Sequence, residues 1–220
     1  MPKRKILLFL YFIIFFLDAL GVLFPEWISR KYITFLPFPI LTLLYIYSVK
    51  KINWFYMTAL VCTFLGIVLF NTKAYFKEAL IFYGIGVCFY VIVSLKTAKV
   101  IPIKSICIAT VPFLIIYLVP LILYSDAVQI DIFNYIMFYV FFVGLFFFIS
   151  TLVYINQRNK TNLWLLCSGV LFLISTIIHG YNLFFEYLTI IRVGVVVTFL
   201  TMHFAMYKYC LLYTSPSPRD

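Results

Sequence analysis

Ionisable side chains stand well inside long apolar segments of this 220-residue chain, among them Asp18 in the first segment and His179 in the seventh. Hydrocarbon strongly disfavours such groups, so each is expected to face the interior of a helix bundle or a water-filled cavity. A carboxylate and an imidazole that meet there can transfer protons to and from a substrate. We therefore predict Asp18 and His179 as the candidate catalytic residues.

Further polar residues of the seventh and eighth segments are predicted to share that cavity. In the seventh segment they are Ser168, Ser175, His179 and Asn182, at offsets of 0, 7, 11 and 14 residues. At about 100° per residue these offsets fall on a single stripe of a helix. In the eighth segment Arg192 and His203 are eleven residues apart and nearly eclipsed. The predicted substrate-binding residues are Ser175, Asn182, Arg192 and His203.

A structural role is the alternative for the same residues. Ser and Asn side chains bond neighbouring helices in membranes without any further function. Asp18 could likewise pair with Arg192 and serve only to hold two helices together, or Arg192 could extend to the membrane surface. The sequence leaves both interpretations open.

The elements that must position these residues are membrane-spanning helices. Of the chain, 65% is hydrophobic and 11% is charged, whereas a soluble domain has about 25% charged residues. A soluble globular protein is therefore excluded. A spanning helix needs about 20 apolar residues, and eight such segments are predicted, at approximately residues 6–24, 33–48, 54–70, 79–95, 105–124, 132–154, 163–185 and 188–209. The predicted fold class is an all-α integral membrane protein, an eight-helix bundle in which Pro37 and Pro39 bend the second helix.

The distribution of charge predicts the orientation of this bundle. The chain has 17 Lys and Arg residues against 7 Asp and Glu, a net charge of +10. If the N-terminus is cytoplasmic, most of the basic residues fall in cytoplasmic loops, as the positive-inside rule requires. The acidic loop residues, Glu26, Glu78, Asp126, Asp131 and Glu186, then all fall on the outer side. We predict that both termini are cytoplasmic and that the protein is a multi-pass protein of a bacterial-type inner (cytoplasmic) membrane.

The last eleven residues are predicted to be foreign to the protein. Residues 210–220 read CLLYTSPSPRD, which resembles the in-frame translation of a common sequencing-library adaptor. A segment of that origin has to be excluded from reasoning about the fold. The expectation is a single eight-span domain over residues 1–209, with the native C-terminus missing.

The sequence contains no motif that indicates binding of a metal, a nucleotide or a nucleic acid. The four cysteines before residue 210 are Cys62, Cys88, Cys107 and Cys167, within or beside apolar segments. Their separations of 26, 19 and 60 residues are not metal-ligand spacings. No phosphate-binding glycine loop and no soluble-hydrolase motif occurs. We predict no metal, no cofactor and no nucleic-acid partner. The predicted partner is membrane lipid, and no protein partner is indicated.

Three segments together resemble the YhhN-like family of membrane proteins, whose characterised members are lysoplasmalogenases. Residues 36–41 read LPFPIL and resemble the family's KPLPxL motif, and residues 63–69 read TFLGIVL and resemble its SLLGDVLL motif. Residues 168–182 resemble its GALLFxxSDxxLAxN motif, and residues 198–203 are more weakly similar to a tYxxAQ pattern. The resemblance implies an eight-span fold and hydrolysis of a vinyl ether lipid.

The chain departs from the family motifs where the chemistry would lie. Ile67 and Thr176 stand at the positions of two family acids, and Leu36 stands at that of a lysine. Vinyl ether hydrolysis requires a group that protonates carbon and a group that activates water, a task suited to carboxylates. Neither Ile67 nor Thr176 can do either.

Three functions remain open on the sequence. The loss of both acids favours a non-catalytic relative that keeps the fold and binds lipid. The second is an active lysoplasmalogen hydrolase whose acid and base are relocated to Asp18, His179 or Glu186. The third is a small proton-linked transporter, for which intramembrane Asp, His and Arg residues are also typical.

Overall fold

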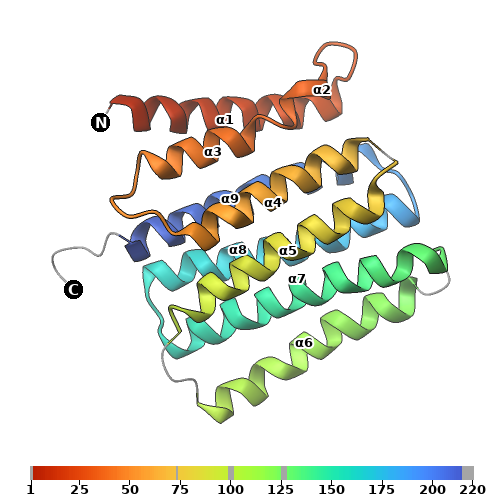
Figure 1. Ribbon diagram of the computed structural model, residues 1–220. Helices are drawn as coiled ribbons and strands as arrows, with labels where there is room; N and C mark the ends of the chain where they lie inside the picture. The colour runs from red at the N-terminus through yellow and green to blue at the C-terminus, as the bar shows by residue number, and fades with distance from the viewer. Residues whose placement is uncertain (1, 73, 99–101, 125–127, 215–220) are drawn as a thin grey trace.

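The computed structural model describes residues 2–72, 74–98, 102–124 and 128–214, and all regular structure in these ranges is helical. The helices are α1 (Pro2–Leu23), α2 (Arg30–Ile33), α3 (Pro37–Ile46), α4 (Trp54–Asn71), α5 (Phe76–Leu95), α6 (Ile103–Tyr124), α7 (Ile130–Asn156), α8 (Lys160–Phe184) and α9 (Thr189–Thr214). Apart from the short α2, successive helices run antiparallel to one another (Figure 1). The all-α class is confirmed.

Six of the described helices are long and apolar enough to cross a membrane, by length and composition. They are α1, α4, α5, α7, α8 and α9. Large apolar side chains remain exposed on their outer faces, among them Phe9, Phe16 and Val61. Lipid tails cover such faces in a bilayer, so the six helices indicate a membrane-embedded, multi-pass protein.

The predicted second span, residues 33–48, is wrong in length. Its helix, α3, has 10 residues, about 15 Å at a rise of about 1.5 Å per residue, which is half of the roughly 30 Å of a hydrocarbon core. The chain forms single turns at Thr34 and Phe35 and restarts as α3 with Pro37 at its first position. Proline is favoured there because it has no N–H to lose. The expected bend is therefore a break ahead of Pro37.

The described basic and acidic residues are distributed unevenly between the two ends of the bundle. One end carries the turns from α3 to α4 and from α7 to α8, the C-terminal end of α5 and the N-terminal ends of α1 and α6, together with the C-terminal end of α9 (Figure 1). We call it the basic end; its charged residues are Lys3, Arg4, Lys5, Lys50, Lys51, Lys96, Lys104, Arg158, Lys160 and Lys208. Every described Asp and Glu lies in the opposite half. This arrangement has the asymmetry that the sequence predicted.

Helix α9 continues past the predicted boundary at Tyr209 and ends at Thr214. Cys210 and Leu211 are buried in the core beside Tyr209. The run Cys210, Leu211, Leu212, Tyr213 is as apolar as the helix before it, so the helical pattern carries on without a break. Residues 215–220 of the predicted adaptor segment lie outside the described residues.

Candidate functional site

A cavity of about 150 Å³ lies in the half of the bundle opposite the basic end, close to the turns from α4 to α5 and from α8 to α9. Most of its lining is apolar or aromatic and includes Phe70, Leu80, Tyr83, Val140 and Phe199. Its described ionisable lining consists of Asp18, Arg30, His179 and Arg192, together with tyrosines. The volume is about that of a cavity that holds a benzene-sized molecule, so a larger ligand would place only a part of itself there. We call this end of the bundle the cavity end.

The polar stripe predicted on the seventh segment is a single face of α8, and it faces α9. Ser168 Oγ donates to Met202 O at 3.0 Å, and Ser175 Oγ lies 3.4 Å from Val195 O. Farther along, His179 Nδ1 lies 3.1 Å from Arg192 Nη1. Both serine bonds hold two helices together, so the alternative of a packing role is supported for Ser168 and Ser175.

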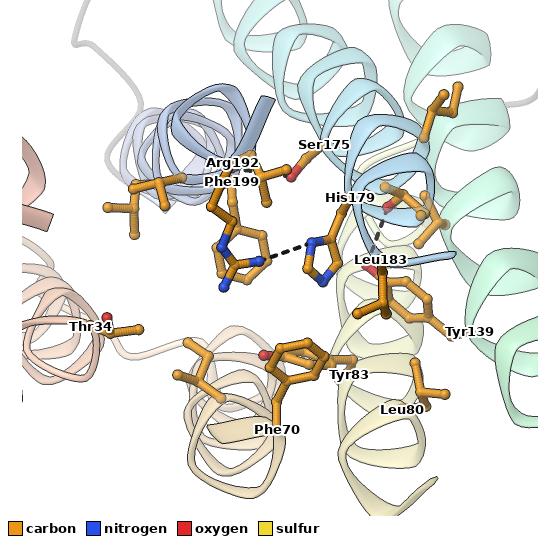
Figure 2. A pocket seen from close by; sticks show the side chains of 18 of the residues that line it. Thr34, Phe70, Leu80, Tyr83, Tyr139, Ser175, His179, Leu183, Arg192 and Phe199 are labelled. Carbon is orange, nitrogen blue, oxygen red and sulfur yellow. Dashed lines mark hydrogen bonds between the residues drawn. The ribbon is translucent and has the colours of Figure 1, made fainter. Parts of the chain in front are cut away.

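His179 and Arg192 extend into the cavity from α8 and α9 (Figure 2). A guanidinium group can only donate hydrogen bonds, so Nδ1 of His179 is the acceptor in their contact. The imidazole is then neutral and carries its proton on Nε2. The Nε2–H group of His179 is therefore a hydrogen-bond donor in addition to the Arg192 guanidinium. The neutral ring does not offset the positive charge of Arg192.

The predicted pairing of Asp18 with Arg192 is wrong. The ion-pair partner of Asp18 is Arg30, whose Nε lies 2.8 Å from Oδ1, and Thr34 Oγ1 donates to the same oxygen at 2.9 Å. Asp18 itself is buried, with 3% of its surface exposed. The turn after α1 brings Arg30 back over that helix, and the shorter sequence separation favours this partner over one on α9.

Gly21 makes room for this return of the chain. A Cβ atom built at Gly21 would lie 2.6 Å from Arg30 Cγ and 3.2 Å from the backbone oxygen of Ile28. A larger residue would therefore press against the segment that carries Arg30. The glycine allows the close approach that the ion pair with Asp18 requires.

Both positions at which the resemblance implies acids line the cavity. Ile67 reaches it from α4 and Thr176 from α8. Thr176 Oγ1 lies 3.2 Å from the Tyr139 hydroxyl on α7, and the ring of Tyr139 packs near that of Tyr83 on α5. Two positions more than a hundred residues apart in the sequence thus meet at one cavity, although neither side chain can ionise.

Two predicted substrate-binding residues do not line the cavity. Asn182 donates from Nδ2 to Leu188 O at 2.8 Å and so fixes the turn from α8 to α9. His203 is buried deeper in the bundle, where its Nδ1 atom lies 2.8 Å from the Tyr90 hydroxyl. The side chain of Phe199, one turn away on α9, packs against His203 and itself lines the cavity. Helical spacing correctly predicts that Arg192 and His203 share one face of α9. Because they lie about three turns apart along the helix, only Arg192 reaches the cavity.

Four further residues line the cavity that the sequence did not predict as part of a site: Arg30, Thr34, Tyr83 and Tyr139. A signal for Arg30 was present, since a buried carboxylate needs a cation and Arg30 is the first basic residue after Asp18. Thr34 follows one turn later. The two tyrosines carried no signal, because nothing distinguished them from the other aromatic residues of their helices.

The cavity combines two guanidinium groups, one carboxylate and one neutral imidazole with a mainly apolar wall. Within the described ranges no group of three or more His, Cys, Asp or Glu residues could hold a metal ion. The arrangement can bind an amphiphilic molecule whose polar part contacts the arginines.

The chain matches no protein-family model, no curated protein and no solved structure.

Proposed function

We propose that this protein binds a membrane lipid in the cavity without hydrolysing it, as a divergent, non-catalytic relative of the YhhN-like family. The observation that carries the proposal is the chemistry of the cavity at Ile67 and Thr176. An enol ether hydrolase needs ionisable groups at its reacting atoms, and neither of these side chains supplies one.

The carboxylate that does line the cavity supports the same proposal. Asp18 is already paired with Arg30 at 2.8 Å. Its Oδ1 atom already accepts hydrogen bonds from Arg30 Nε and Thr34 Oγ1, so this oxygen is engaged within the protein. The apolar lining suits an acyl or alkenyl chain, since burying such a chain in contact with Phe70, Leu80 and Val140 is favourable.

Filling the cavity should remove the lipid. Thr176→Phe places a large ring in the cavity and is expected to abolish most of the lipid that copurifies with the protein in mild detergent. The matched control is Ile174→Phe on the same helix, because Ile174 is 41% exposed and lies outside the cavity lining. Bound lipid is measured by organic extraction and mass spectrometry. Equal lipid content in both variants would contradict binding in this cavity.

The same preparation tests the absence of hydrolysis. Purified wild-type protein given lysoplasmalogen is expected to release no aldehyde, while a related active enzyme does so in parallel. Release of aldehyde would contradict the proposal and would support the hydrolase, with Asp18→Asn and His179→Ala as the next variants.

The proposal includes an orientation in which the basic end is cytoplasmic, in an inner membrane. In a variant whose native cysteines are replaced, Ser29→Cys is expected to react with a membrane-impermeant maleimide on intact cells, because residue 29 is exposed at the cavity end. Gln157→Cys, in the turn between α7 and α8 at the basic end, is expected to react only after permeabilisation. Labelling in the reverse order would overturn the orientation, and labelling of both on intact cells would contradict a transmembrane arrangement.

A further inference from the structure

We infer that Arg192 forms a binding site for an oxyanion, the carboxylate or phosphate of an amphiphile whose head group is net anionic. This inference rests on the proposed lipid-binding function and names the class of lipid.

The charges that line the cavity do not cancel. Asp18 and Arg30 form an ion pair at 2.8 Å and neutralise each other. Arg192 remains, and no carboxylate of the described residues lies within 4.0 Å of its guanidinium nitrogens. Arg192 is close enough to both Asp18 and Arg30 for their charges to act on it. The described lining therefore carries one net positive charge in a partly buried place, where a bound anion would restore neutrality.

The hydrogen-bonding capacity of Arg192 is also largely free. A guanidinium has five N–H groups, and among the described residues the side chain of Arg192 makes one hydrogen bond, to His179 Nδ1 at 3.1 Å. That contact orients the group toward the interior of the cavity (Figure 2). The planar fork of N–H donors matches the spacing of two oxygens in a carboxylate or phosphate.

The apolar part of the cavity lining favours binding of an amphiphile over binding of a simple ion. The cavity wall also includes Phe70, Tyr83, Phe199 and Leu183, which lie around the same space as Arg192 (Figure 2). A small hydrated anion would lose water there and gain only one cation. An anion attached to an alkyl chain gains burial of that chain as well. A zwitterionic head group would bring an ammonium close to two guanidinium groups, which repel it. The one carboxylate of the lining is already paired with Arg30, so a zwitterion is expected to bind less well.

The test uses the whole purified chain in mild detergent, and native mass spectrometry measures the bound lipid. The protein is offered equal amounts of lysophosphatidic acid and lysophosphatidylcholine with the same acyl chain. Wild type is expected to retain the anionic lipid at least about tenfold better. Arg192→Gln should lose about tenfold or more of that binding, as is usual when a charge-assisted hydrogen bond is removed. Arg158→Gln removes the same charge at the basic end and should change nothing.

Arg192→Lys keeps the charge but not the fork and is expected to bind with intermediate affinity, which keeps the test valid if Arg192→Gln does not fold. Equal retention of both lipids by wild type would overturn the anion site and leave lipid binding intact. Retention of neither lipid would overturn both. Displacement of lysophosphatidic acid by millimolar inorganic phosphate would keep the oxyanion site but assign it to a soluble ligand, against the lipid.

Discussion

Asp18→Asn is expected to lower the free energy of unfolding by about 3 kcal/mol. The substitution keeps the shape of the side chain and an oxygen that can accept from Thr34, but it removes the charge that faces Arg30. Arg30 is then left partly buried without its carboxylate, and breaking a buried ion pair from one side costs about 3 to 5 kcal/mol. The lower end of that range applies because the Arg30 side chain is 23% exposed. Unfolding in mixed detergent micelles measures the change.

The matched control is the second ion pair of the described chain. Lys77 Nζ lies 2.7 Å from Asp131 Oδ2, with side chains that are 41% and 56% exposed. Exposed pairs contribute about 1 kcal/mol or less, so Asp131→Asn should have a much smaller effect than Asp18→Asn. The double variant Asp18→Asn/Arg30→Gln should recover part of the loss, because it removes the unpaired cation. Equal losses from Asp18→Asn and Asp131→Asn would contradict a stabilising ion pair.

Gly169→Ala is expected to destabilise the bundle by about 2 kcal/mol, within the usual cost of overpacking a tight interface. Gly169 of α8 packs directly against Ser150 and Phe147 of α7. A Cβ atom there would lie 3.0 Å from Ser150 Cβ and 3.3 Å from Phe147 Cα. Because one of these contacts is with backbone, α7 and α8 would have to separate. Small residues at helix contacts are how membrane helices achieve such close packing.

A second glycine provides the control for this prediction. A Cβ atom at Gly194 would meet nothing closer than Ile178 Cδ1 at 3.4 Å, an ordinary contact. Gly194→Ala should therefore be neutral or stabilising, because alanine favours a helix over glycine by about 1 kcal/mol. Adding Ser150→Gly to Gly169→Ala should restore part of the stability by removing the side chain that the new methyl group meets. If the two Gly→Ala variants unfold alike, close packing of α7 on α8 is not the cause.

The ion pair of Asp18 and the close packing at Gly169 lie in different parts of the protein, but both support the cavity. The Asp18–Arg30 pair holds the turn after α1 against the bundle and balances one of the two cavity arginines. The contact at Gly169 keeps α7 close to α8, which in turn brings Tyr139 within 3.2 Å of Thr176 in the cavity wall. Loss of either contact is therefore expected to weaken lipid binding as well as stability.

Local composition was enough to determine the class of the molecule. Long apolar runs can form only helices in a membrane, since each backbone polar group must bond within its own segment. The helical repeat was enough to place Ser168, Ser175, His179 and Asn182 on one face, and all four do bond α9 or the turn before it. The alternation of basic and acidic loops was likewise readable from the sequence.

Only the tertiary structure decided which side chains meet. It assigned Asp18 to Arg30 rather than to Arg192, placed Ile67 and Thr176 at one cavity, and set Asn182 and His203 apart from it. It also showed that the second predicted span, residues 33–48, contains a shorter helix, Pro37–Ile46. The physical reason is that periodicity fixes the direction in which a side chain leaves its own helix, whereas the neighbour and the depth at which it meets that neighbour depend on how whole helices pack.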